Sequence, residues 1–124
     1  MPKAQVYKLS AIKDCGWTAL ARIALPDGTI AQQADISTIT CTVMDDDGTA
    51  NSPGSLTVAN VIFDTLQTSD GRWDGDSTGF NFAYEVPATS FPAANFTRVE
   101  FTFTPAAGAV FKLIYEGVVL TSYD

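Results

Sequence analysis

Apolar and polar residues alternate along most of this chain, and a period of two is the pattern of half-buried β-strands. The clearest case is residues 36–44, where Ile39, Cys41 and Val43 share one side and threonines occupy the other. The 3.6-residue period of an amphipathic helix is hard to find. Alternation of the same kind covers residues 18–25, 80–86, 98–104 and 111–115. The pattern therefore predicts a protein built from strands.

Turn residues separate these strands and indicate how they connect. Residues 26–29 (PDGT) follow the first alternating stretch, and Pro87 ends a later one. Proline fixes φ and glycine accepts a positive φ, so both favour turns. Residues 105–108 (PAAG) predict an antiparallel hairpin between the strands on either side. Residues 45–55 and 69–79 are two long polar loops.

The number and spacing of strands indicate the fold class. A weaker strand around residues 5–12 adds to the set, and residues 56–68 mix a short strand with an apolar run that the pattern does not divide. Seven or eight short strands with turn signals between them predict an all-β fold, an Ig-like antiparallel β-sandwich. We expect one domain over residues 1–124, with residues 1–15 as an edge strand or arm.

The composition agrees with a folded, sheet-rich domain. The chain has 124 residues, the size of one domain, and 46% of them are hydrophobic. Only 17% are charged, below the roughly 25% of an average globular protein. The 15 threonines suit a pleated, half-exposed surface. The inward phase of the strands predicts a core that contains Ile39, Cys41, Val43, Phe82, Tyr84, Val99, Phe101, Phe103, Phe111 and Leu113.

Charge is unevenly distributed along the chain. The net charge of −7 argues against nucleic acid, because phosphates require a basic surface. Residues 1–22 nevertheless carry a net charge of +3, and the remainder carries −10. Lys3, Lys8 and Lys13 are therefore candidate contacts with an acidic neighbour, including another copy of this chain. The alternative is that these lysines only solubilise an edge strand.

The sequence also bears on compartment and redox state. It has no apolar stretch typical of a signal peptide near residue 1 and no 18-residue apolar window, so we expect cytoplasmic synthesis and no membrane partner. Cys41 lies on the apolar side of its strand, and Cys15 precedes Gly16 in a turn. A Cys15–Cys41 disulfide is compatible with the sequence but not required by it. We expect both thiols to be reduced.

The residue types that most enzymes need are missing. The chain has no histidine, which excludes Ser–His and Cys–His nucleophilic catalysis and histidine-ligated zinc. It contains neither GxxxxGK[ST] nor GxGxxG, the glycine-rich patterns that bind phosphates. We therefore expect no catalytic residues and no enzyme activity.

The second polar loop contains two candidate features. Asp70, Asp74 and Asp76 place several carboxylate oxygens, the ligands that calcium requires, on a flexible, glycine-rich backbone. Ordinary solvated turns have the same composition. No cofactor is expected, with calcium as the open alternative. Trp73 is either an exposed anchor for a protein or sugar, or a lid folded onto the end of the sandwich.

Residues 35–119 resemble small Ig-like proteins from the virions of tailed bacteriophages. The resemblance is carried by ITCTV at 39–43, VIFDTLQT at 61–68, FNFAYEVP at 80–87 and the final hairpin at 99–119. It implies a non-catalytic structural protein, synthesised in the host cytoplasm and located in the virion as a head decoration, neck or tail accessory. Its partners would be other virion proteins, including further copies of itself. The alternative is an Ig-like module that binds a carbohydrate or host surface through the Asp/Trp loops.

Overall fold

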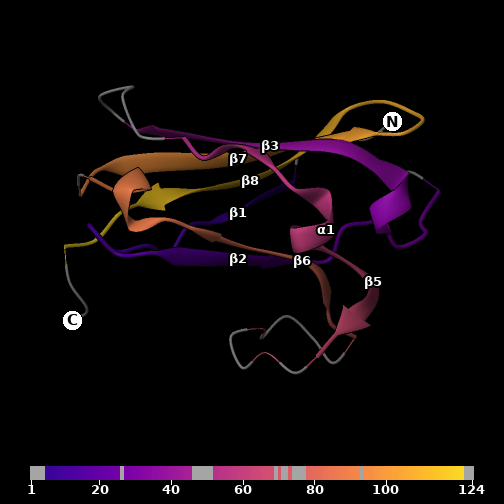
Figure 1. Cartoon of the computed structure of the whole chain (residues 1–124). Coiled ribbons are helices and arrows are strands. Elements are labelled where there is room, and N and C mark those ends of the chain that lie inside the picture. The colour runs from indigo at the N-terminus through magenta and orange to yellow at the C-terminus, as the bar shows by residue number, and fades with distance from the viewer. Residues whose placement is uncertain are drawn as a thin grey trace.

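The computed structural model describes residues 5–25, 27–45, 52–68, 70, 73, 78–92 and 94–121. Two β-sheets lie face to face with short helical turns in the connections (Figure 1). The strands of this described part are β1 Gln5–Lys8, β2 Trp17–Ala21, β3 Ile36–Asp45, β4 Gly54–Leu56, β5 Ile62–Gln67, β6 Phe80–Val86, β7 Phe96–Pro105 and β8 Phe111–Val118. The helical turns are η1 Gln33–Asp35, α1 Val58–Val61 and η2 Ala88–Ser90.

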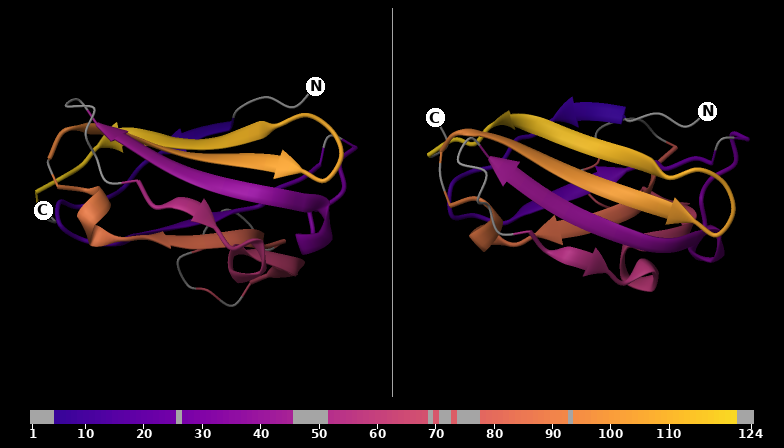
Figure 2. Two further views of the ribbon diagram at one scale, coloured as in Figure 1. Left: turned by 45° about the horizontal axis from the view of Figure 1, so that its top comes forward. Right: turned by 90° about the horizontal axis from the view of Figure 1, so that it is seen from above.

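The strand order confirms the predicted all-β sandwich. One sheet has the order β1-β8-β7-β3-β4 and the other has the order β2-β6-β5 (Figure 2). The strand order within each sheet is that of an Ig-like sandwich. In the smaller sheet, β2, β6 and β5 correspond to strands B, E and D. In the larger sheet, β3, β7 and β8 correspond to strands C, F and G. All pairs are antiparallel except β1 with β8, which run parallel. Alternation alone does not reveal the direction of an edge strand.

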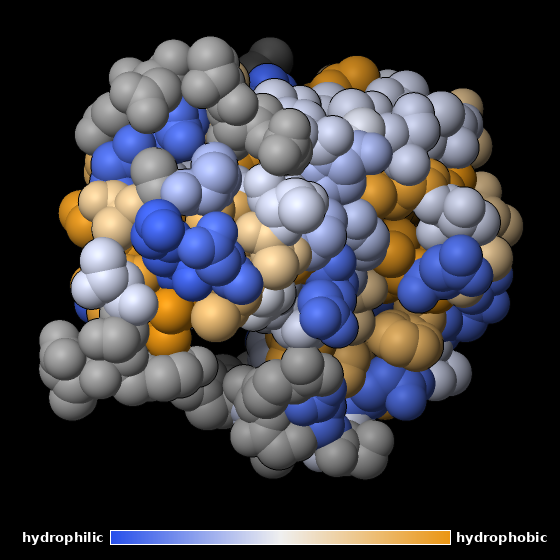
Figure 3. Space-filling view, turned by 60° about the vertical axis from the view of Figure 1, so that its left-hand side comes forward, coloured by the Kyte–Doolittle hydropathy of each residue, from blue (hydrophilic) through white to orange (hydrophobic). Residues whose placement is uncertain are grey.

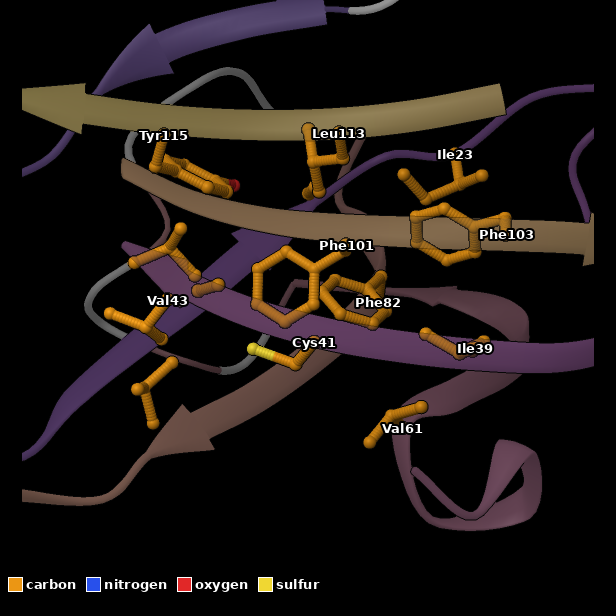
Figure 4. Close-up of a cluster of buried hydrophobic side chains, with 14 of the residues drawn as sticks. Ile23, Ile39, Cys41, Val43, Val61, Phe82, Phe101, Phe103, Leu113 and Tyr115 are labelled. Carbon is orange, nitrogen blue, oxygen red and sulfur yellow. The ribbon is translucent and has the colours of Figure 1, made fainter. Parts of the chain in front are cut away.

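Aromatic rings from both sheets form the centre of the core (Figure 4). The ring of Phe82 on β6 lies 4.9 Å from that of Phe101 and 5.4 Å from that of Phe103, both on β7 and both edge-to-face. This geometry is the one that aromatic quadrupoles favour. Of the ten predicted core residues, only Tyr84 and Phe111 are partly rather than fully buried, and both pack against the core.

Residues outside the alternating stretches complete this core. Leu9, Ile23 and Phe91 lie in connections between strands, yet each is at most 4% exposed. Residues 56–68, which the sequence pattern did not divide into elements, contain the last residue of β4, the helical turn α1 and the strand β5. In α1, Val61 points into the core (Figure 4). Connections are thus part of the packing between the sheets.

Asn81 departs from the alternation. Its position between Phe80 and Phe82 predicts an outward, solvated side chain, but its exposure is 0%. The side-chain oxygen accepts a hydrogen bond from the Ile23 amide at 2.6 Å, and the side-chain nitrogen donates to the carbonyls of Ile23 and Ala31 at 2.9 and 2.8 Å. The segment after β2 covers Asn81, and its amide satisfies backbone groups there.

Candidate functional site

The basic segment, Lys3, Lys8 and Lys13, is only partly described. Lys3 lies outside the described residues. Lys8 ends β1 and is in register with Glu116 of β8, with its side chain exposed. Lys13 is exposed in the next turn, where its Nζ lies 3.1 Å from Asp14 Oδ2. Lys13 thus has an acidic partner within the chain, and a role for these lysines in an interface stays a prediction.

Trp73 lies at the opposite end of the sandwich from Lys13. It is half-buried, and its ring centroid is 5.7 Å from that of Phe80, the first residue of β6. The ring centroid of Phe63, on the edge strand β5, lies 6.0 Å from that of Phe80 in an edge-to-face contact. Of the two interpretations of Trp73, this packing favours the lid. Trp73 and Lys13 therefore do not belong to one contact surface.

The calcium hypothesis concerns residues that are mostly outside the described part. Asp74 and Asp76 are not described, whereas Asp70 is partly buried and its carbonyl accepts a hydrogen bond from the Trp73 amide at 3.0 Å. Among the residues that the structure describes, no group of three His, Cys, Asp or Glu side chains is placed to hold a metal ion. A calcium site formed by Asp70, Asp74 and Asp76 stays a prediction.

The two cysteines are free and lie in different environments. Cys15 is exposed in the turn before β2, and Cys41 is fully buried under the aromatic core. Burial raises the pKa of the Cys41 thiol to about 12, because the interior disfavours the thiolate. The structure places the two thiols apart as free cysteines, and the reduced state of both stays a prediction.

A charged cluster that the sequence did not predict lies on the outer face of the five-stranded sheet. Arg98 on β7 pairs with Glu116 at 3.0 Å and with Glu100 at 3.3 Å, and Lys112 on β8 pairs with Glu100 at 3.0 Å. Partial burial acts to raise the pKa of Glu100, but hydrogen bonds from Lys112 and Arg98 outweigh it and lower that pKa. The spacing of Arg98 and Glu100, two residues apart on one strand, could have suggested an ion pair between them. The pairs Arg98–Glu116 and Lys112–Glu100 depend on the register of β7 with β8 and could not be read from the sequence.

Apolar side chains reach the surface beside this cluster, at the end of the sheet where β3 and β8 finish and β7 begins. Phe96 is 44% exposed and is directly opposite Val118, which is 58% exposed. Met44 is 51% exposed and is opposite Arg98, two residues along β7 from Phe96. We call Met44, Phe96 and Val118 the apolar patch. Figure 3 faces this end of the molecule, where hydrophobic residues come to the surface among hydrophilic ones.

Threonine side chains continue this outer face along β3 and β7, away from the apolar patch. In the pairing of β3 with β7, Thr40 lies opposite Thr102 and Thr38 opposite Thr104. The alternation of β3 points these threonines away from the buried Ile39 and Cys41. Beyond the ion-pair cluster, the β3 and β7 part of this face therefore offers hydroxyl groups, whereas Lys8 is exposed on β1 beside Glu116.

Comparison with family models, with curated proteins and with solved structures finds nothing that matches this chain. In the part of the chain that the structure describes, no helix is long and apolar enough to span a membrane.

Proposed function

We propose that this protein is a non-catalytic structural component of a phage particle, a head decoration, neck or tail accessory protein that acts through contacts with other virion proteins. The virion location follows from the resemblance of residues 35–119 to Ig-like virion proteins. The observation that supports contact with other proteins is the apolar patch of Met44, Phe96 and Val118.

The patch has the properties of a protein contact surface. Its residues lie side by side, because Phe96 and Val118 face each other across β7 and β8 and Met44 is on the neighbouring strand β3. Removing such a group of large apolar side chains from water lowers the free energy. Clusters of exposed apolar surface therefore commonly mark protein contacts. The ion pairs of Arg98 next to the patch leave few unpaired charges to be desolvated.

The alternative function, recognition of a carbohydrate or host surface, relied on Trp73 and the acidic loops. Trp73 packs against Phe80 and is half-buried, which reduces the area that it offers to a ligand. The neighbouring Asp74 and Asp76 lie outside the described residues. At the residues of this loop that the structure describes, no observation favours recognition over subunit contact.

The test is to replace the patch and measure assembly. In a Phe96→Ser, Val118→Ser double variant we expect self-association in sedimentation, or binding to purified phage particles, to weaken at least tenfold. Since both side chains are exposed, the fold should be retained, as circular dichroism would verify.

Val110→Ser is the matched control. Val110 is 52% exposed, but it lies in the turn between β7 and β8 at the other end of the sheet. It should assemble as the unmodified protein does. If the unmodified protein is a monomer that binds no particle, or if the double variant assembles normally, the proposed function is wrong.

A further inference from the structure

The N-terminal arm, residues 5–13, lies along one edge of the five-stranded sheet (Figure 2). Its first part is β1, whose neighbour in the sheet is β8. Beyond β1, the Leu9 amide donates to the Glu116 carbonyl at 2.9 Å, and the Lys13 amide donates to the Leu120 carbonyl at 2.7 Å. The arm therefore runs parallel to β8 and to the continuation of β8 as far as Leu120.

Apolar side chains fix the arm in this position. Leu9 and Ala11 are both buried and belong to the hydrophobic core. Gly117 of β8 leaves space for the arm, because a Cβ at this position would be only 2.9 Å from the Leu9 carbonyl oxygen. Removing the arm would expose Leu9 and Ala11 to water, which is unfavourable. An arm therefore has to occupy this place, but an identical arm from a second copy fills it equally well.

Residues 14–16 connect the arm to β2 in a turn with an uncommon backbone conformation. Asp14 has a φ of 61°, in the left-handed region that residues other than glycine seldom adopt. The Cys15 amide closes the turn by donating to the Ile12 carbonyl at 3.0 Å. Extending these residues would remove the left-handed conformation of Asp14. A short connection under strain favours exchange of the segment that it joins, because the connection extends in the exchanged form.

Exposed apolar side chains lie close to this turn. Leu120, whose carbonyl accepts a hydrogen bond from the end of the arm, is 52% exposed. Val118 of the apolar patch is two residues earlier and is 58% exposed. Two copies that exchanged arms would be joined at their turns, which would bring a second copy next to these side chains. The arm makes the same contacts before and after exchange. Burial of further apolar surface and relief of the turn therefore favour the dimer over two monomers.

We propose that two copies of this protein exchange their N-terminal arms, so that β1 of each copy pairs with β8 of the other. Such a reciprocal exchange is two-fold symmetric and closes as a dimer. Residues 1–22 carry a net charge of +3 and the remainder carries −10, so the arm is attracted to a second copy as it is to its own chain. The inference goes beyond the proposed function, because it specifies how two copies join and requires no other particle protein.

The test is to join β1 to β8 by a disulfide and to determine whether the bond lies within one chain or between two. Lys8 and Glu116 are in register on these strands. Neighbouring strands are about 4.8 Å apart, within the range that a disulfide spans. A variant that combines Lys8→Cys and Glu116→Cys with Cys15→Ser, which removes the exposed native thiol, is equilibrated at several concentrations, oxidised and analysed by non-reducing denaturing electrophoresis. We expect a covalent dimer whose share rises with protein concentration.

Variants that carry only one of the introduced thiols, Lys8→Cys or Glu116→Cys with Cys15→Ser, are the matched controls. They should remain monomeric, because exchange places each thiol beside a position that has none. A monomer with an internal disulfide at every concentration, or equal dimer formation by the controls, would overturn the proposal. Neither result concerns the apolar patch, so the exchange can fail while binding to phage particles persists.

Substitutions of Asp14 test the role of the turn. Asp14→Gly should favour the closed monomer, because glycine adopts a left-handed φ without strain, and Asp14→Val should favour the exchanged dimer, because a β-branched residue resists this φ. We expect the dissociation constant of the dimer in sedimentation to rise and to fall, respectively, by about fivefold or more. Asp14→Asn is the matched control, since asparagine tolerates this conformation as aspartate does. Equal dissociation constants for all three variants would contradict the exchange. Because Asp14→Gly relieves the turn, loss of its dimer is not loss of the fold.

Discussion

Asn81 makes three hydrogen bonds inside the protein, all to the backbone of the segment that follows β2. The Ile23 amide and the Ala31 carbonyl face the core side of this segment, where water does not reach them. A buried polar group without a partner loses the free energy of its hydration. The side-chain amide therefore stabilises the protein mainly by preventing unpaired backbone groups.

Replacing Asn81 by alanine should lower the free energy of unfolding by about 2–4 kcal/mol, because the Ile23 amide and the Ala31 carbonyl lose their partner. Urea denaturation followed by fluorescence would measure this change. Asn60→Ala is the matched control, since Asn60 is exposed, and it should change the free energy of unfolding by less than about 0.5 kcal/mol. An equal effect of both substitutions would contradict this account of Asn81.

At the scale of elements, Tyr115 joins the two sheets. It lies on β8, and its hydroxyl donates to the Leu20 carbonyl of β2 at 3.1 Å. Leu20 is on β2, the edge strand of the smaller sheet, so this hydrogen bond ties that edge to the five-stranded sheet. Burial first, and then the nearby Tyr7, raise the pKa of Tyr115 above its ordinary value of 10. The protonated hydroxyl is thus the form that the folded protein requires.

Tyr115→Phe should lower the free energy of unfolding by about 1 kcal/mol at pH 8, since one hydrogen bond is lost. The unmodified protein should also lose stability as the pH rises from about 9 to 12. Cys41 and Tyr115 have raised pKa values when folded and therefore lose protons more readily when unfolded, so their stabilisation is complete below their ordinary values and declines above them.

Urea midpoints at pH 8 and pH 11 would measure both effects. The decline between these pH values should be smaller in Tyr115→Phe than in the unmodified protein, because one of the groups with a raised pKa no longer titrates. A decline of the same size in both proteins would show that Tyr115 does not contribute to it.

At the scale of the whole molecule, charge and apolar surface are distributed so that association has two separate sources. The apolar patch is on the outer face of the five-stranded sheet, whereas Lys8 is on the edge strand β1 and Lys13 in the turn after it. Apolar contacts are insensitive to moderate salt, but exposed charge pairs are screened beyond about 10 Å at 0.1 M. Salt therefore distinguishes the two contributions.

If the basic segment contributes to assembly, raising the salt concentration from 0.05 to 0.5 M should weaken it in sedimentation experiments, and combining Lys3→Glu, Lys8→Glu and Lys13→Glu should abolish it without unfolding the domain. Ala107→Glu is the control for a change of charge elsewhere, since Ala107 is exposed in the turn between β7 and β8, at the far end of the sheet from the apolar patch. Assembly that survives the triple substitution would mean that these lysines only solubilise the β1 edge.

The candidate surfaces were only partly predictable. Lys8 and Lys13 stand out in the sequence because they lie in a basic stretch of an acidic chain. The apolar patch does not stand out, because Phe96 and Val118 are far apart in sequence and become neighbours only through the β7–β8 register. A pocket lined by Gly16 and Glu85 does not stand out for the same reason, since β6 and the turn before β2 are distant along the chain.

The sequence by itself determined the strands and the inward side of each, because alternation is a local property that burial of one face of a sheet imposes on neighbouring residues. Cys41, Phe82 and Phe101 are buried as that pattern predicts. Only the tertiary structure decided the parallel pairing of β1, the burial of Asn81 and the link from Tyr115 to Leu20. Each of these depends on which distant backbone groups would otherwise lack a hydrogen-bond partner, and that is settled only when the two sheets come together.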